Sequence, residues 1–238
     1  MNLDLSKIKD IHEEDSDTTV FAGISNLRVL MKLRDMKLPV TLTILIPTSK
    51  RGVHMSRLIK AVKDVSADDD YIENILLKIC DEVNKSHNSG CKIIAKFDYP
   101  IKNSDQFMKV RVEIQRNAPI KYLFKRLGIT ACPCSKEMTG IGHMQRAWLI
   151  IEIESESILD FNEVASKMAE CFSVTPAEYL KRPDEAKLIL VSQENAKFVE
   201  DVVREALKRF TNANKIIAKA MESIHSHDAY AIWYKGLA

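Results

Sequence analysis

Cys132 and His143, in the middle of the chain, are of the residue types that bind a transition metal. Thiolate and imidazole are the ligands that zinc prefers. The two residues lie eleven positions apart, on a loop between two expected strands that can bring their side chains together. Cys134 makes only a C-x-C pair, which lacks the C-x-x-C spacing of zinc ribbons, and we expect it to be inert. These residues indicate a site with few cysteines and an open coordination position.

A second polar group lies between two expected strands near the end of the chain. Glu222, His225, His227 and Asp228 stand within seven residues of one another. In an extended segment, His225 and His227 project to the same face. There the imidazoles can act as ligands, proton carriers or phosphate donors. A polar turn with solvated histidines is the competing interpretation, and spacing alone does not decide between the two.

Three other charged stretches have a structural interpretation beside a functional one. Lys181–Glu185 is expected to be a solvated loop before a helix. Glu200 and the aspartate after it are typical of a helix N-terminus, where the helix dipole favours carboxylates. Arg51, His54 and Arg57 surround a glycine just before an expected helix. That arrangement suits phosphate binding, but it also describes a basic surface turn.

Composition narrows the class of protein. The chain has 238 residues and a formal net charge of +2, so there is no global electrostatic argument for binding nucleic acid. No apolar run approaches the length of a transmembrane helix, and the polar N-terminus lacks the order of a signal peptide. We therefore expect a cytoplasmic protein without a membrane partner. Five cysteines, an odd number, argue against a disulfide framework and leave metal binding open.

Hydrophobic periodicity predicts the elements that position these residues. In the first half, strands are expected over Leu27–Leu33, Val40–Ile46, Ile93–Tyr99 and Met108–Ile114, and helices over Met55–Val65 and Tyr71–Val83. In the second half, strands are expected over Ile120–Ala131, Ala147–Ile153, Ile216–Met221 and Ala229–Trp233, and helices over Ile158–Cys171 and Phe198–Phe210. Each half thus follows the order strand, strand, helix, helix, strand, strand.

This order predicts an α+β fold in which antiparallel sheets carry helices on one face. We expect a mobile N-terminal arm over residues 1–20, a first half over 21–118, and a second half over 119–238 that carries the metal site. The shared order of the halves indicates a weak internal duplication. Open sheet edges need covering, and a second subunit would cover them.

Five stretches, taken together and in order, resemble the type IB GTP cyclohydrolase family. The archaeal GTP cyclohydrolases of methanopterin synthesis share its ancestry. The stretches are Arg51–Arg57, Cys132–Ser135 with His143–Arg146, Lys181–Glu185, Phe198–Asp201 and Glu222–Ala231. One position departs from the pattern, because Met144 stands where the family commonly has Asn. The hydrogen bonds around His143 are therefore expected to differ.

The resemblance implies a tandem tunnelling fold (T-fold), with two copies per chain assembled into an oligomeric barrel. The implied assembly is a homotetramer with its sites at subunit interfaces. The implied reaction converts GTP and water to 7,8-dihydroneopterin triphosphate and formate, the first step of pterin synthesis toward folate or queuosine. One divalent metal per subunit is implied, and Zn²⁺, Fe²⁺ and Mn²⁺ all remain candidates.

The resemblance also assigns roles to positions of this chain. The implied metal ligands are Cys132, His143 and Glu185, and Cys132 counts among the catalytic residues as well. The implied group for proton handling during ring opening is Glu222, His225 and His227. Glu200 is the implied anchor for the guanine edge, which would reject purines that lack the 2-amino group. The candidates for the triphosphate are Arg51, His54 and Arg57.

Two alternatives to this activity stay open. The first is the archaeal-type reaction, which uses Fe²⁺ and ends in a 2′,3′-cyclic phosphate of dihydroneopterin. The second is a non-catalytic T-fold binding protein whose metal is structural. The presence of Glu200, Glu222 and the two histidines after it argues against the second alternative, since a structural metal needs none of them.

Overall fold

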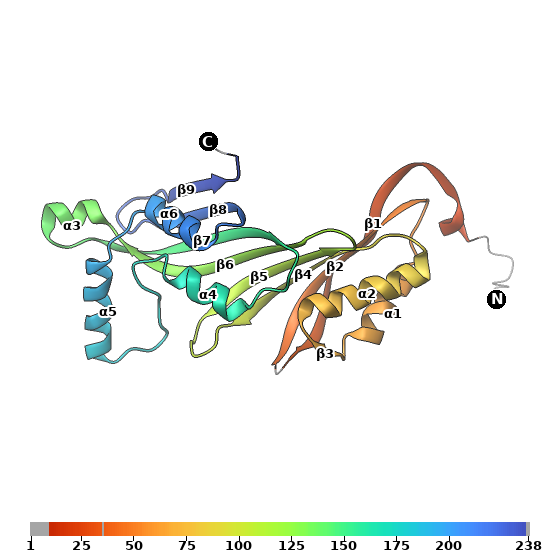
Figure 1. Ribbon diagram of the computed structural model, residues 1–238, viewed down its shortest axis with the longest axis horizontal. Helices are drawn as coiled ribbons and strands as arrows, with labels where there is room; N and C mark the ends of the chain where they lie inside the picture. Colours follow the sequence, from red (N-terminus) through yellow and green to blue (C-terminus); the bar gives the residue numbers. More distant parts are fainter. Residues whose placement is uncertain (1–9, 35, 237–238) are drawn as a thin grey trace, which may run out of the picture. The chain divides into compact units, whose positions relative to one another are not determined.

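The computed structural model describes residues 10–34 and 36–236, and this part of the chain forms two compact units (Figure 1). The first unit consists of the residues up to Lys96 together with Glu113–Pro119. The second unit consists of Phe97–Val112 and the residues from Ile120 onward. None of the helices in the described ranges is both long and apolar enough to cross a membrane.

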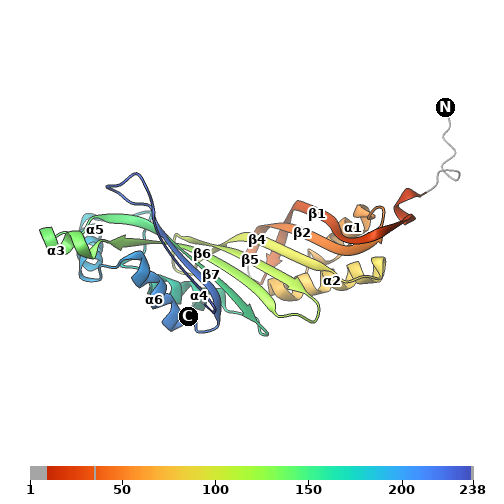
Figure 2. The same ribbon diagram turned by 90° about the horizontal axis from the view of Figure 1, so that it is seen from above.

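The first unit is built on a long antiparallel hairpin. Its strands β1 and β2 pair along most of their length, β2 also pairs antiparallel with β4, and the short β3 runs parallel to β1. Helices α1 and α2 pack against each other, and α1 contacts β1 (Figures 1 and 2). The elements are β1 (Asp15–Leu33), β2 (Met36–Lys50), α1 (Met55–Val65), β3 (Asp69–Asp70), α2 (Ile72–His87) and β4 (Lys92–Pro100).

Alternating and helical periodicity account for these elements. Every second residue of the central part of β2 is buried, namely Val40, Leu42, Ile44 and Ile46, which confirms the predicted alternation. The apolar face predicted for α2 is buried as well, with Ile72, Ile75, Leu76, Ile79 and Val83. The helix ends at His87, and Asn88 follows it in the left-handed region at φ 48°.

The second unit carries an antiparallel sheet in which β6, β7, β8 and β9 are neighbours in that order. Helix α6 packs on β8 and β9, and α4 packs on β6 (Figure 1). The elements after β5 (Phe107–Gln115) are β6 (Ile120–Ala131), α3 (Pro133–Thr139), β7 (Met144–Ser155), α4 (Phe161–Ala169), α5 (Arg182–Glu194), α6 (Val199–Arg209), β8 (Ala213–Ala220) and β9 (Ala229–Tyr234).

The α+β class and the mostly antiparallel sheet are confirmed, and three expectations about segments need correction. Residues 1–9 of the expected arm lie outside the described residues, but residues 15–20 already belong to β1, in which Asp15 pairs with Lys50 and Val20 with Thr48 of β2. Two helices, α3 and α5, were not expected. Most of Lys181–Glu185 is the first turn of α5 rather than a loop, since Pro183 and the two carboxylates after it suit a helix N-terminus.

Candidate functional site

Cys132 and His143 face each other because the β6–β7 ladder places them there. The last registered pair of that ladder is Ala131 with Met144. Cys132 and His143 are the next pair in the same register, and the backbone N–H of Cys132 donates to the carbonyl of His143 at 2.9 Å. The predicted meeting of the two residues on one loop therefore follows from strand pairing.

The loop between them is a short helix with its own internal hydrogen bonds. Cys132 is the N-cap of α3, and its Sγ accepts from the backbone N–H of Ser135 at 3.5 Å. The hydroxyl of Ser135 donates to the carbonyl of Cys132 and accepts from the backbone N–H of His143 at 3.1 Å. Ser135 thus ties both candidate ligands to one side chain. Cys134, in contrast, is exposed.

The last turn of α5 clamps this loop from the other side. Gln193 accepts from the backbone N–H of Gly142 at 2.7 Å and donates to its carbonyl at 3.0 Å. A side chain at Gly142 would meet the backbone carbonyl of Cys132 at 2.6 Å, so glycine is needed for this close approach. The hydroxyl of Ser192 donates to the sulfur of Met144 at 3.2 Å. Met144 therefore takes part in a hydrogen bond of its own, although it cannot make those of the expected Asn.

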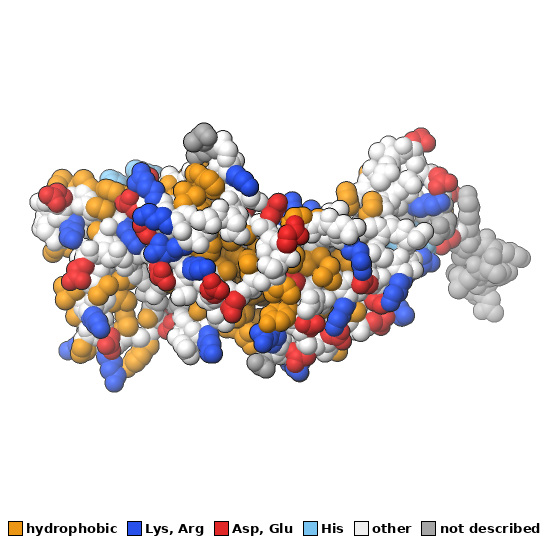
Figure 3. Space-filling model, viewed as in Figure 1, with side chains coloured by type: hydrophobic (Ala, Val, Ile, Leu, Met, Phe, Trp, Pro, Cys, Tyr) orange, Lys and Arg blue, Asp and Glu red, His pale blue; other side chains and the backbone are white. Residues whose placement is uncertain are grey.

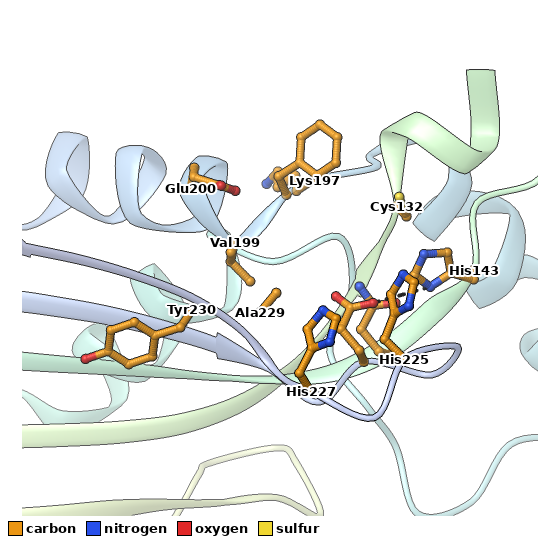
Figure 4. Close-up of a pocket in the computed structure, with 12 residues that line it drawn as sticks. Cys132, His143, Lys197, Val199, Glu200, His225, His227, Ala229 and Tyr230 are labelled. Carbon is orange, nitrogen blue, oxygen red and sulfur yellow. Dashed lines mark ion pairs between the residues drawn. The ribbon is translucent and has the colours of Figure 1, made fainter. Parts of the chain in front are cut away.

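A pocket of about 290 Å³ opens beside Cys132 and His143 (Figure 4). All of its lining residues belong to the second unit, and they are Cys132, His143, Gln145, Lys197, Phe198, Val199, Glu200, Glu222, His225, His227, Ala229 and Tyr230. Six of the ten residues predicted for the site line this pocket, and they come from four separate stretches of sequence. The volume is near the lower end for small-molecule sites, so a nucleotide would extend beyond it.

His143 is held by the loop between β8 and β9. Its Nδ1 lies 3.1 Å from the hydroxyl of Ser223 and 4.0 Å from a carboxylate oxygen of Glu222 (dashed line, Figure 4). The side chains of His143 and Glu222 are 18% and 11% exposed, so little water separates them. A partner on Nδ1 orients the ring and leaves Nε2 as the nitrogen available to a metal.

His225 and His227 lie together in the pocket, but not for the predicted reason. They belong to the irregular segment between β8 and β9, not to a strand. Their rings are stacked, with centroids 5.0 Å apart and planes inclined by 10° (Figure 4). Both side chains are exposed at the pocket rim. The turn brings them together where strand alternation was expected to do so, and either ring can exchange protons with water and with a bound molecule.

Glu200 lines the pocket from the first turn of α6 (Figure 4). The neighbouring Asp201 has a structural task, because its carboxylate accepts from the backbone N–H of Phe198 at 3.0 Å and caps the helix. Glu200 is exposed, and its carboxylate has no hydrogen-bond or ion-pair partner within the described residues. From the sequence, Glu200 and Asp201 are alike, as two carboxylates at a helix N-terminus. In the structure Asp201 caps the helix and Glu200 faces the pocket.

Two residues on the pocket wall were missed by sequence reasoning about single motifs. The ammonium of Lys197 donates to the carbonyls of Glu170 and Phe172, and burial lowers its pKa. The side-chain carbonyl of Gln145 is buried and has no hydrogen-bond partner within the described residues. Gln145 follows the His143 motif directly, so its proximity was visible in the sequence, whereas its buried, unpaired oxygen was not.

Glu185, the expected third metal ligand, does not line the pocket. It is exposed in the first turn of α5, where its backbone N–H donates to the carbonyl of Lys181. The part of α5 that reaches the metal loop is its last turn, at Gln193. Eight residues of helix correspond to ~12 Å along the axis. The carboxylate near His143 in the structure is that of Glu222.

The three residues expected to bind the triphosphate belong to the first unit. Arg51 and His54 lie between β2 and α1, and Arg57 lies in the first turn of α1. Arg51 pairs with Glu14 at 2.6 Å, His54 lies 3.7 Å from a carboxylate oxygen of Asp10, and the guanidinium of Arg57 donates to a backbone carbonyl at 3.5 Å.

The donors on the pocket wall fit a divalent transition metal. Cys132 and His143 supply sulfur and nitrogen, and the carboxylate of Glu222 stands in the same pocket. Thiolate, imidazole and carboxylate together suit Zn²⁺ and Fe²⁺ better than Mg²⁺ or Ca²⁺, which prefer oxygen ligands.

Comparison with known proteins shows the family to which the chain is related. Residues 8–231 match the family described as Type I GTP cyclohydrolase folE2. The chain is 29% identical to GTP cyclohydrolase MptA of Korarchaeum cryptofilum, over 95% of this chain and 92% of that protein. It is 28% identical to GTP cyclohydrolase FolE2 of Pseudothermotoga lettingae, over 94% of this chain and 97% of that protein. Because the family match spans nearly the whole sequence, this chain belongs to the type I GTP cyclohydrolase (folE2) family.

Proposed function

We propose that this protein is a GTP cyclohydrolase that hydrolyses the guanine ring of GTP and releases formate. The observation that carries the proposal is the pocket itself, which joins Cys132 and His143 to Glu222, His225 and His227. Metal donors and proton-exchanging groups in one pocket are what hydrolysis of a C–N bond in a purine requires. The names of the relatives, GTP cyclohydrolase in both the FolE2 and MptA groups, support the same activity.

In this proposal Cys132 and His143 hold one divalent ion per subunit. When bound, such an ion would lower the pKa of its water and so would make hydroxide available at neutral pH. His225 and His227 deliver the protons that the ring nitrogens need as the imidazole ring opens. Glu222 orients His143 through the 4.0 Å contact between its carboxylate and Nδ1 of the ring. We also assign it to proton handling, because a carboxylate can pass a proton to a histidine that has given up its own.

Glu200 is proposed to bind the guanine edge. Its exposed carboxylate faces the pocket from the first turn of α6, and two N–H groups of guanine can donate to its two oxygens (Figure 4). The unpaired carbonyl of Gln145 is a further acceptor for the purine. A purine without the 2-amino group would leave a carboxylate oxygen unpaired and would bind more weakly.

The third metal ligand remains Glu185 in this proposal, with Glu222 as its competitor. Glu185 requires the first turn of α5 to approach the pocket, whereas Glu222 already stands near His143. Metal content separates the two. If Glu185 is the ligand, the Glu185→Gln variant loses the ion, and the Glu222→Gln variant keeps the ion but loses turnover. If Glu222 is the ligand, the Glu222→Gln variant loses the ion and the Glu185→Gln variant keeps it.

Arg51, His54 and Arg57 are proposed to bind the triphosphate. Arginine and histidine before a helix suit phosphate oxygens. Because Glu14 and Asp10 already face Arg51 and His54, a triphosphate there would have to displace these carboxylates. Replacing Arg57 by Ala should therefore raise KM for GTP more than it lowers kcat, and an unchanged KM would remove it from the site.

The proposed assembly is a homotetramer of tandem T-folds with its sites at subunit interfaces. Exposed apolar side chains around α3 and α5 support a partner there (Figure 3). They are Met138, Ile141, Tyr179, Leu180 and Leu190. Monomers seldom leave such groups uncovered. Light scattering of the purified chain measures the assembly, and a monomer at working concentration contradicts it.

Product analysis after incubation with GTP tests the function. We expect formate and 7,8-dihydroneopterin triphosphate, with Zn²⁺, Fe²⁺ or Mn²⁺ supplied in turn to find the metal that supports turnover. Anion-exchange chromatography distinguishes the triphosphate from the 2′,3′-cyclic phosphate of the archaeal-type reaction, which the MptA relative keeps in consideration. Binding of GTP without formate release under every metal would instead favour a non-catalytic binding protein.

A further inference from the structure

A second group of metal-binding side chains lies in the first unit, and none of its members lines the pocket. Asp10, His12 and His54 each offer one ligand atom, and the three atoms lie within 4.8 Å of one another. The carboxylate of Asp10 is 2.9 Å from Nδ1 of His12 and 3.7 Å from Nε2 of His54. The two imidazole rings are 4.9 Å apart. Ligand atoms around a tetrahedral zinc ion are ~3.4 Å apart, so small side-chain rotations would close the three around one ion.

The fold holds the two halves of this group together. Asp10 and His12 lie at the short 3-10 helix before β1, and His54 is the N-cap of α1. The backbone N–H of Arg51 donates to the carbonyl of Glu14 at 2.8 Å, and their side chains form an ion pair at 2.6 Å. The adjacent residues Asp15, at the start of β1, and Lys50, at the end of β2, form a second ion pair at 2.8 Å. These contacts fasten the segment that carries Asp10 and His12 to the turn that carries His54.

The His12 ring packs against the backbone at Gly52. A β-carbon at position 52 would lie 2.4 Å from Cδ2 of the His12 ring, closer than any real side chain allows. The ring therefore rests on the backbone of the turn that leads to His54. This close approach is a second observation, independent of the ligand distances, that the turn and the histidine are fitted to each other.

We propose that Asp10, His12 and His54 form a binding site for a divalent transition metal such as Zn²⁺, Co²⁺ or Ni²⁺. Two imidazoles and one carboxylate are ligands that these ions accept, and Mg²⁺ and Ca²⁺ do not favour imidazole. Asp10 and His12 are about half exposed, so solvent can complete the coordination. The ion would cross-link the segment before β1 to the turn before α1. The proposal uses none of the residues that line the pocket, but it shares His54 with the residues proposed above to bind the triphosphate, so an ion and a triphosphate would compete for that side chain.

Metal titration of the full chain and of matched variants tests the proposal. The background is Cys132→Ser with His143→Ala, which removes the thiolate and the imidazole proposed to hold the ion in the pocket. We expect this protein to retain one equivalent of Co²⁺ or Zn²⁺ per chain by equilibrium dialysis. The retained Co²⁺ should lack the thiolate-to-metal charge-transfer band that we expect for the unmodified chain.

Adding His12→Gln to that background should weaken binding at least tenfold, and Asp10→Asn should weaken it severalfold. Asp17→Asn is the matched control, since Asp17 is an exposed carboxylate on β1 outside the group, and it should leave the affinity unchanged. Circular dichroism checks that each variant is folded. No retained equivalent in the background, or equal binding by folded His12→Gln and Asp17→Asn variants, would overturn the proposal. Neither result changes what the GTP assay of the unmodified chain says about the proposed function.

Discussion

The two candidate metal centres of this protein are built in different ways. Cys132 and His143 stand at the end of a paired ladder, and Ser135 and Gln193 fix the loop around them. Asp10, His12 and His54 sit between a 3-10 turn and a helix start, held by exposed ion pairs and one backbone hydrogen bond. Side chains that are fixed before binding lose less entropy when an ion arrives, so the pocket centre should bind more tightly and select more strictly.

The donor atoms widen this difference. The pocket offers a thiolate, which favours soft ions and loses its proton on binding, whereas the group in the first unit offers only nitrogen and oxygen. We therefore expect the pocket to keep its ion through purification and the first unit to exchange its ion with the buffer. The comparison separates an ion needed for chemistry from one that would fasten a segment.

The largest expected effect is the loss of turnover in Cys132→Ala. Without the thiolate the ion is lost, and formate release from GTP should fall at least about a thousandfold, or about 4 kcal/mol of transition-state stabilisation. Formate is measured by coupled assay and metal by elemental analysis. Cys134→Ala is the matched control, because Cys134 is exposed and lies two residues away, and its activity should change less than twofold. Undiminished turnover in Cys132→Ala removes this residue from the site.

Two glycine-to-alanine variants perturb the two centres separately, and a third serves as their control. Gly142→Ala places a methyl group against the backbone carbonyl of Cys132, which cannot move aside without opening the ladder. We expect metal affinity in the pocket to fall about 10- to 100-fold, as it does when residues that support metal ligands are replaced. The free energy of unfolding should fall by about 1–3 kcal/mol.

Gly52→Ala meets only the movable ring of His12, so its effect on stability should be smaller and confined to the group in the first unit. Gly90→Ala meets nothing and is the control. Thermal unfolding and metal titration of the three proteins rank them. Equal losses in Gly142→Ala and Gly90→Ala would contradict the close approach at the metal loop.

Thiol modification sharpens the contrast between the pocket and the core. Burial raises the pKa of the Cys171 thiol to about 12, so almost no thiolate exists there near neutral pH. Cys134 is exposed and should react first with iodoacetamide. Cys132 should follow, and added Zn²⁺ should protect Cys132 without slowing Cys134. Mass spectrometry of the peptides follows each site. Rapid labelling of Cys171 in the folded protein is incompatible with its burial.

Glu14→Gln should have the smallest effect. It removes the ion pair with Arg51 but leaves the backbone hydrogen bond between the same residues. Because Arg51 is largely exposed, the free energy of unfolding should fall by about 0.5 kcal/mol or less. Metal affinity in the first unit should weaken a few-fold, and affinity in the pocket should not change. A loss in the pocket would show that the two centres are coupled.

The family resemblance singled out most of the pocket residues. Hydrophobic periodicity predicted the strand ends and helix starts that several of them occupy. The alternation in β2 and the meeting of Cys132 with His143 are of this kind. Glu185 was harder, because whether a helical residue reaches a pocket depends on which turn of α5 packs on the loop. The stacking of His225 and His227 depends on an irregular turn that has no period to detect. The group in the first unit joins residues more than forty positions apart.

The strand register beneath Cys132 and His143 also frees the segment between them. Since the ladder places the two residues as a pair, the number of residues from Cys134 to Ile141 does not determine the separation of the ligands. The exposed tip of α3 is therefore a place where related chains can differ in length and where a reporter peptide can be inserted. Cys132 and His143 would remain opposite each other while the loop between them changes in length.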